Sequence, residues 1–206
     1  MEKLGAMLIL ASSSPTRKAL MEQAGLRFEV APAAIDERAI EARALGEGAD
    51  ARDLAALLAQ AKAEAVSSFY PDALVIGADQ TLALGTELLH KPLDRSDAEG
   101  QLDHLAGKTH RLHAAVSIAR NGTAIWSDIE TAELTMREFS QAERDLILDL
   151  EGEAALGSVG GYRLEGPSIR LFEKITGDYF TILGLPLLPL LAALRDIEPD
   201  LLLARA

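Results

Sequence analysis

Short apolar runs alternate along this chain with longer segments in which apolar residues recur every three or four positions. The first run, Met7 to Ala11, predicts a buried strand. Three hydroxyl residues follow it, and then Pro15, which suits the first turn of a helix reaching about Ala24. A later run, residues 73–78, is apolar throughout, as in strands that are covered on both faces. Strands alternating with helices predict an α/β fold.

Capping and turn residues divide the rest of the chain into further predicted elements. The expected helices are 51–68 after an Asp50 cap, 96–105 from a Ser96/Glu99 capping box, 140–150 from a Ser140/Glu143 box, and 186–195 after Pro186. The expected strands are 26–31, 81–84 with 87–89, 109–120 with 123–134 across Asn121-Gly122, and a last pair, 168–175 with 179–183. No repeat or composition break interrupts this pattern, so we expect a single domain over residues 1–206.

Composition narrows the functional classes. Of the 206 residues, 20 are Lys or Arg and 32 are Asp or Glu, a net charge of −12, which argues against non-specific binding to nucleic acid or to an anionic membrane. The chain has no Cys, so disulfides, thiolate nucleophiles and zinc–thiolate sites are excluded. No targeting signal or apolar run of about 18 residues is present, and we expect a soluble cytoplasmic protein.

The junction between the first strand and the first helix has the composition of an anion site. Free N–H groups and the positive end of the helix dipole attract phosphate, and the hydroxyls of Ser12 to Ser14 add donors. Arg17 and Lys18 add positive charge within the first turn. The alternative is that Ser14 only caps the helix while Arg17 and Lys18 are solvated.

Three further charged residues stand where chemistry is expected. Lys62 falls on the apolar face of the 51–68 helix with Leu54 and Leu58, so it needs a partner, unless its stem snorkels and leaves the ammonium in water. Asp79 follows the 73–78 run, at the edge where α/β sheets bind ligands, unless it is only a turn or cap residue. The 81–89 hairpin then returns Lys91 toward Asp79.

Other constellations are excluded or weaker. His110 and His113 lie three apart in a predicted strand, so they face opposite sides and cannot share a metal. The chain has no G-x-S-x-G elbow, Walker A motif or G-x-G-x-x-G fingerprint. Asp36-Glu37 forms an acidic pair past the second strand, although a solvated loop would have the same composition. A phosphate-binding turn with lysines and a carboxylate indicates hydrolysis of a phosphoanhydride.

Taken together, these segments resemble the Maf family of nucleoside triphosphate pyrophosphatases. The resemblance rests on motifs in order and spacing from about Leu8 to Leu194: Leu10–Arg17, Asp36-Glu37, Lys62-Ala63, Gly77–Gln80, Lys91-Pro92, Gly107 before His110, Glu165-Gly166 and Gly184–Leu187. It implies a single elongated mixed sheet flanked by helices, in two lobes with a central cleft. It also implies cleavage of nucleoside triphosphates to the monophosphate and pyrophosphate, with a divalent cation such as Mg²⁺ or Mn²⁺, often by homodimers.

The resemblance also assigns roles. It implies that Asp79 is the proton acceptor, and that the phosphates are held by Ser12, Arg17, Lys62 and Lys91. To this we add Ser13 in the same turn, and Glu37 as a metal ligand beside Asp79.

Three positions bear on the base. The dTTP/UTP-cleaving branch usually carries Arg, Thr and Gln where this chain has Thr16, Gln80 and Glu165, and Gln80 and Glu165 resemble the branch that acts on 7-methyl-GTP. A carboxylate only accepts hydrogen bonds, so Glu165 complements the N1–H and N2 amino donors of guanine rather than the two carbonyls of a pyrimidine. Thr16, and Gly157-Ser158 where many members carry Asp-Lys, depart from the pattern.

The sequence therefore predicts a pyrophosphatase that removes modified nucleotides before they are polymerised. One alternative is a nucleotide-binding regulator of cell division with weak or incidental hydrolysis. Another is a pyrophosphatase of broad or pyrimidine preference, in which Glu165 binds the base through water or as the protonated acid.

Overall fold

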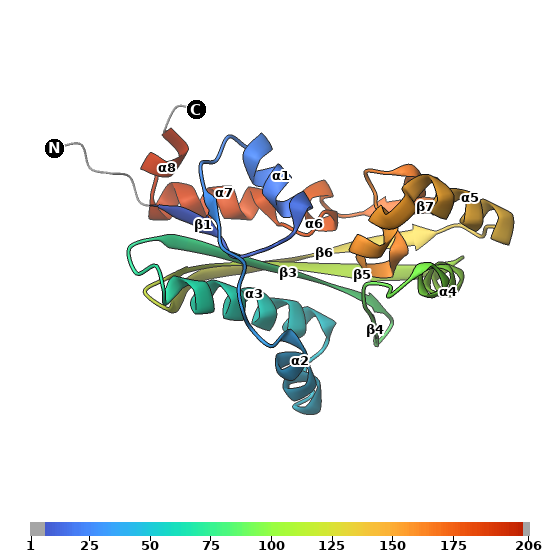
Figure 1. Cartoon of the computed structure of the whole chain (residues 1–206), viewed down its shortest axis with the longest axis horizontal. Helices are drawn as coiled ribbons and strands as arrows, with labels where there is room; N and C mark the ends of the chain where they lie inside the picture. Colours follow the sequence, from blue (N-terminus) through green and yellow to red (C-terminus); the bar gives the residue numbers. More distant parts are fainter. Residues whose placement is uncertain (1–6, 204–206) are drawn as a thin grey trace. The chain divides into compact units, whose positions relative to one another are not determined.

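The computed structural model describes residues 7–203, which form an α/β fold with one mixed sheet of seven strands (Figure 1). The strand order is β2-β1-β3-β5-β6-β7, and β4 pairs with β3. The strands are β1 (Leu8–Leu10), β2 (Glu29–Val30), β3 (Leu74–Leu84), β4 (Glu87–Leu89), β5 (Thr109–Arg120), β6 (Thr123–Met136) and β7 (Phe172–Thr176). The helices are α1 (Pro15–Gln23), α2 (Glu37–Gly46), α3 (Ala51–Ser67), α4 (Arg95–Leu105), α5 (Gln141–Glu151), α6 (Tyr179–Ile182), α7 (Leu187–Ile197) and α8 (Asp200–Leu203), with three 3₁₀ helices, η1 (Gly152–Gly157), η2 (Val159–Gly161) and η3 (Pro167–Leu171).

The chain divides into two compact units. Unit 1 comprises the described residues up to Gln80, Ala114–Glu130 and the described residues from Tyr179 onward, and unit 2 comprises Thr81–His113 and Thr131–Asp178. Strands β3, β5 and β6 pass from one unit into the other. Within the described chain, no helix combines the length and the apolar character needed to cross a membrane.

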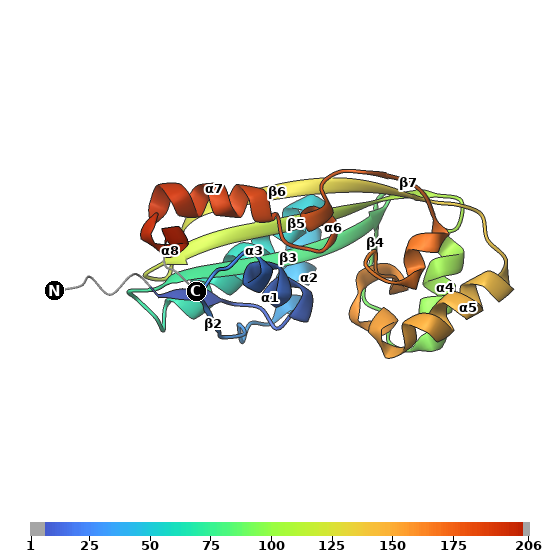
Figure 2. The ribbon, with the colours of Figure 1, turned by 90° about the horizontal axis from the view of Figure 1, so that it is seen from above.

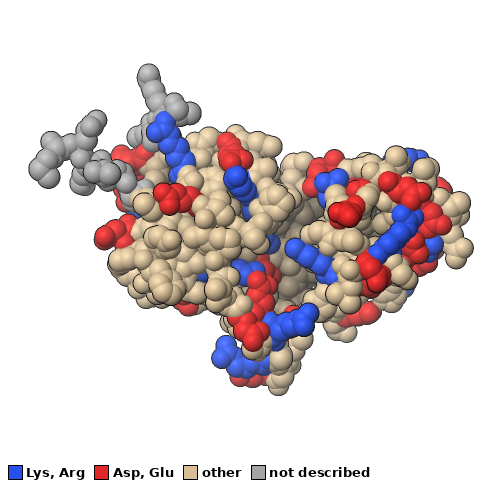
Figure 3. Space-filling view, viewed as in Figure 1, with Lys and Arg blue, Asp and Glu red and all other residues tan. Residues whose placement is uncertain are grey.

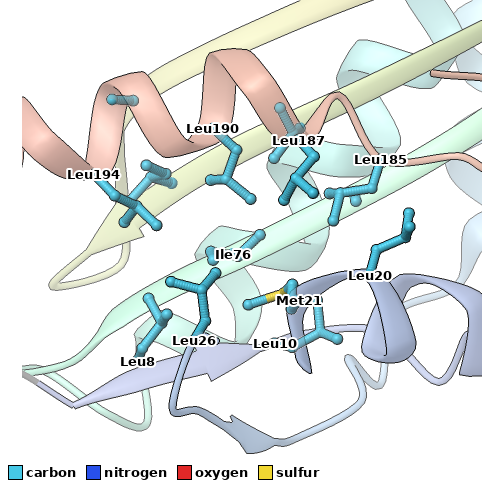
Figure 4. Packing of buried hydrophobic residues seen from close by; sticks show 14 of the residues in the cluster. Leu8, Leu10, Leu20, Met21, Leu26, Ile76, Leu185, Leu187, Leu190 and Leu194 are labelled. Atoms are coloured by element: carbon cyan, nitrogen blue, oxygen red, sulfur yellow. The ribbon is translucent and has the colours of Figure 1, made fainter. Parts of the chain in front are cut away.

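In unit 1 the central strands are buried on both faces, because helices cover each side. Alternate residues of a strand face opposite sides, so the even-numbered residues of β1 and of the first half of β3 join α1 and α7 in one cluster (Figures 1 and 4). Odd-numbered residues of the same strands pack with Val66 of α3 in a second cluster. In the view from above in Figure 2, α7 runs along the strands. This alternation decides which side chains of β3 can meet α3.

Local signals in unit 1 explain where its helices begin. Pro15 occupies the first position of α1, and Asp50 and Asp53 form a reciprocal capping box at the start of α3. Between β5 and β6, Asn121 and Gly122 both adopt positive φ values, 55° and 75°, as a type I′ turn requires. The predicted place of Pro15, the Asp50 cap and the Asn121-Gly122 turn are confirmed.

In unit 2, helices α4 and α5 are joined by ion pairs. Arg144 of α5 contacts Asp103 of α4, and Arg95 of α4 donates to Asp149 of α5 at 2.6 Å. On the face shown in Figure 3, basic side chains are scattered among acidic ones rather than gathered into a patch. The Ser140/Glu143 capping box at the start of α5 forms as predicted.

Several predicted boundaries were wrong. The second strand contains only Glu29–Val30, and helix α2 occupies a segment for which no helix was predicted. Helix α4 is capped by Asp94, whose carboxylate accepts the backbone N–H of Asp97, so Ser96 lies inside the first turn. The 179–183 segment is the one-turn helix α6, and β7 pairs with β6 instead, because so short an apolar run has no distinct period.

Candidate active site

The turn between β1 and α1 is shaped by its own hydroxyls. Ser14 caps α1 by accepting the backbone N–H of Arg17 at 3.4 Å. Ser12 is buried, and its hydroxyl oxygen accepts from the N–H of Ser14 at 3.3 Å and from Arg17 Nη1 at 3.1 Å, whereas Ser13 is exposed. Lys18 is exposed and pairs at 3.6 Å with a glutamate one helical turn further along α1. The solvated alternative therefore holds for Lys18 but not for Arg17.

Arg17 connects this turn to two other segments of unit 1. Its Nε donates to the carbonyl of Gly184 at 2.8 Å, and its Nη1 donates to the carbonyl of Ala78 at 2.8 Å. Burial lowers the pKa of Arg17 from its usual value, while the nearby carboxylates of Asp79 and Glu37 act in the opposite direction. The guanidinium is thus held in a fixed position beside two acidic residues.

Lys62 is buried, and its ammonium lies between two carboxylates. Its Nζ is 2.5 Å from Asp79 Oδ1 and 3.0 Å from Glu37 Oε1, so it does not snorkel into water. Helix α3 can approach β3 closely because the facing strand residue is Gly77, where a Cβ atom would lie only 2.2 Å from the carbonyl oxygen of Ala59. This close packing brings Lys62 to Asp79.

Asp79 lies inside β3 rather than beyond its end, and it is neither a turn nor a cap residue. Pairing of β3 with the parallel strand β1 stops at Ile76, which faces Leu10, and β3 continues to pair with β4. Asp79 therefore lies beyond the part of β3 that pairs with β1. Alternate strand residues face the same side, so Asp79 shares the α3 face with Gly77. Within the described residues, Lys62 is the sole hydrogen-bond partner of its carboxylate.

Gln80 points to the opposite face of β3 from Asp79. Its Nε2 donates to the carbonyls of Thr181 and Ile182 at 3.0 and 2.9 Å. Carbonyl oxygens only accept, so these contacts fix which side of the amide is nitrogen. Gln80 Oε1, a hydrogen-bond acceptor, therefore lies on the other side of the amide, beside Gly184.

The remaining predicted residues make fewer contacts. Thr16 is half-buried in the first turn of α1. Lys91 and Glu165 are exposed, have no hydrogen bond or ion pair within residues 7–203, and belong to unit 2, so their place beside Asp79 stays a prediction. The structure brings together the unit 1 residues Ser12, Arg17, Glu37, Lys62, Asp79 and Gln80.

Carboxylates are the candidate metal ligands of this site. Glu37, in the first turn of α2, and Asp79 share Lys62. The described residues contain no group of three or more His, Cys, Asp or Glu side chains arranged to hold a metal. His110 and His113 bond to different hydroxyl groups, at 2.7 and 2.9 Å.

Sequence reasoning missed the backbone groups that anchor the site. The carbonyls of Ala78, Gly184, Thr181 and Ile182 hold Arg17 and Gln80. Every residue has a carbonyl, so composition cannot show which one a side chain reaches. The Gly184–Leu187 segment, part of the resemblance to the Maf family, was the one available signal.

Comparison with known proteins is consistent with this geometry. A family model described as Maf-like protein matches residues 7–197. The 7-methyl-GTP pyrophosphatase of Rhizobium etli is 54% identical over 190 residues, covering 92% of this chain and 96% of the relative, and that of Rhizobium johnstonii is 55% identical with the same coverage. A nucleoside triphosphate pyrophosphatase of Rhodopseudomonas palustris is 53% identical over 189 residues, covering 92% and 93%. The chain therefore belongs to the Maf family.

Proposed function

We propose that this protein is a nucleoside triphosphate pyrophosphatase that hydrolyses a 7-methyl-GTP-like substrate to the monophosphate and pyrophosphate. The observation that carries the proposal is the buried carboxylate of Asp79, held at one oxygen by Lys62 while the other has no partner within residues 7–203. The names and the high identity of the relatives support the same reaction and the same substrate class.

The residues of unit 1 have complementary tasks in this reaction. Asp79 accepts the proton of a water molecule that cleaves the bond between the α and β phosphates. Lys62 fixes the orientation of that carboxylate through its 2.5 Å contact. Arg17 and the turn at Ser12 and Ser13 bind the negatively charged phosphates, and Lys91 contributes a further positive charge to the same task.

A divalent cation fits the donor set of this site. The carboxylates of Glu37 and Asp79 converge on one ammonium, and Mg²⁺ is commonly held by one or two carboxylates together with substrate phosphates rather than by a cage of protein ligands. Glu37 and Asp79 would hold the ion. When bound, it supplies positive charge that stabilises the departing pyrophosphate.

The base is proposed to be selected by two acceptors. Gln80 presents Oε1 because α6 holds its nitrogen, and the Glu165 carboxylate only accepts. Guanine offers two neighbouring donors, N1–H and the N2 amino group, whereas a uracil or thymine edge offers one donor between two carbonyls. A site built from acceptors rejects the pyrimidine edge because carbonyls would face carboxylate oxygens.

The deciding experiment measures pyrophosphate release with Mg²⁺ or Mn²⁺ from a panel of GTP, 7-methyl-GTP, dTTP, UTP, CTP and ATP. We expect the highest kcat/KM with 7-methyl-GTP. Equal rates with all six would refute the proposed base preference but not the reaction. Binding without release of pyrophosphate from any of them would refute the pyrophosphatase and favour a nucleotide-binding regulator.

A further inference from the structure

Unit 2 contains a carboxylate that the proposed reaction does not use. Glu151 is the last residue of α5, and its side chain has no exposed surface. Burying a carboxylate is costly unless it is paired and hydrogen-bonded, so the site around Glu151 must satisfy it. The residues that do so identify what this carboxylate holds in place.

Both oxygens of Glu151 bind the segment that carries Glu165. Oε2 accepts from Arg163 Nε at 2.8 Å, and Oε1 accepts from the backbone N–H and the hydroxyl of Ser168 at 3.0 and 2.8 Å. Arg163 lies two residues before Glu165, and Ser168 lies three residues after it. One buried carboxylate therefore ties both ends of the 163–168 loop to the end of α5.

The backbone of the loop also packs directly on this carboxylate. A Cβ atom built on Gly166 would lie 2.4 Å from Glu151 Oε1 and 2.8 Å from Oε2, so a larger residue there would displace the Glu151 carboxylate. Gly166 directly follows Glu165. Glu165 itself is exposed and, within the described residues, unpaired. Its position depends on the loop rather than on contacts of its own side chain.

We propose that Glu151 is a positioning residue for base selection, which fixes the 163–168 loop so that the Glu165 carboxylate is presented to the base. This inference rests on the proposed function. Glu151 touches neither substrate nor reacting atoms in this scheme. Its removal should thus change the preference between bases and leave the chemistry at Asp79 unaffected.

The test is a double-mutant cycle with Glu151→Gln and Glu165→Gln, assayed by pyrophosphate release from 7-methyl-GTP and UTP. An amide keeps the size of Glu151, but its NH₂ group would face the Arg163 donor. We expect the ratio of the two kcat/KM values to fall about tenfold, through KM rather than kcat. In the Glu165→Gln background the same change should have no further effect. Glu153→Gln, an exposed neighbour, is the matched control.

Two other results would overturn the inference. Either an unchanged ratio in Glu151→Gln, or an equal loss with and without Glu165, removes Glu151 from base selection while the pyrophosphatase stands. No pyrophosphate from the wild type refutes both proposals. If Glu151→Gln does not fold, Arg163→Met removes the other end of the contact at a half-buried position, and it must produce the same loss of preference.

Discussion

Each compact unit contains a buried carboxylate that accepts a hydrogen bond from a basic side chain, yet the two are satisfied differently. In unit 1, Asp79 accepts from Lys62 at one oxygen, and no other hydrogen bond to its carboxylate occurs within residues 7–203. In unit 2, protein donors occupy both oxygens of Glu151. A carboxylate with unused lone pairs can accept a proton or bind a ligand, whereas a saturated one orders structure. Both carboxylates are buried, so burial does not distinguish them. What distinguishes the reactive Asp79 from the structural Glu151 is an oxygen that no donor of the described chain occupies.

The largest expected effect is the loss of turnover in the variant Asp79→Asn. An amide cannot accept the proton of the attacking water, so kcat should fall by about 10²–10⁴-fold. Binding of a non-hydrolysable triphosphate, measured by calorimetry, should persist because Lys62 keeps its contact with Glu37 at 3.0 Å. Glu151→Gln should keep kcat within about twofold of the wild type. Wild-type turnover in Asp79→Asn would remove Asp79 from the mechanism and break the comparison.

The site residues that could be predicted from the sequence are those whose polarity does not match the position they occupy. Lys62 stood out because an apolar helix face rarely carries a lysine, and its burial is confirmed. The sequence pattern also places Ala61 and Ala65 on this face, but both are half-buried, whereas Ala59 and Ala63 are buried. The Asp50 cap, the Ser140/Glu143 box and the hairpin at Asn121 follow from local chemistry and were predicted correctly, whereas the cap of α4 was not.

The parts that sequence could not predict depend on contacts between distant segments. Gln80 is oriented by α6, about one hundred residues later, and α6 itself was predicted as a strand. Glu151 read as an ordinary residue at the end of a helix, since nothing local shows that Arg163 and Ser168 fold back onto it. The predicted end of the strand at residue 78 was also wrong, because β3 continues through Asp79 to Leu84, where it pairs with β4.

The second expected effect is a pH dependence of stability that arises from His110 of unit 2. This residue is buried, and its hydrogen bonding is less complete than that of Glu151. Its Nε2 is 2.7 Å from the Tyr162 hydroxyl, the Phe172 ring packs beside it, and its Nδ1 has no partner within residues 7–203. Burial lowers the pKa of His110 from 6.5 to about 4. Between these values the unfolded chain binds a proton that the folded protein does not, so stability falls as the pH falls.

The loss should approach about 3 kcal/mol near pH 4 and vanish above pH 6.5. Urea unfolding of the wild type and of His110→Gln across this range measures it, because glutamine cannot titrate. The difference in free energy of unfolding between the two proteins should change with pH in that window. A constant difference would show that His110 is protonated as readily in the folded protein as in the unfolded chain.

The smallest expected effect tests how the Asp79 site is held. Gly77→Ala places a methyl group 2.2 Å from the carbonyl oxygen of Ala59, so α3 must shift and move Lys62 away from Asp79. Overpacking of this kind costs about 1–3 kcal/mol of stability. The matched control is Gly100→Ala in α4, where the added Cβ meets nothing in the described chain within 4 Å beyond the neighbouring backbone of its own helix, so alanine should be neutral or stabilising.

The kinetics of Gly77→Ala distinguish the role of Asp79 from that of Glu151. Because Gly77 supports the Lys62–Asp79 contact and Glu151 is held within unit 2, Gly77→Ala should lower kcat at a temperature where the variant is fully folded. Its ratio of kcat/KM between 7-methyl-GTP and UTP should stay that of the wild type, since the 163–168 loop keeps all its contacts with Glu151. A change in that ratio with kcat unaltered would mean that the α3–β3 packing governs the base and not the reaction, which would reverse the division of tasks between the two units.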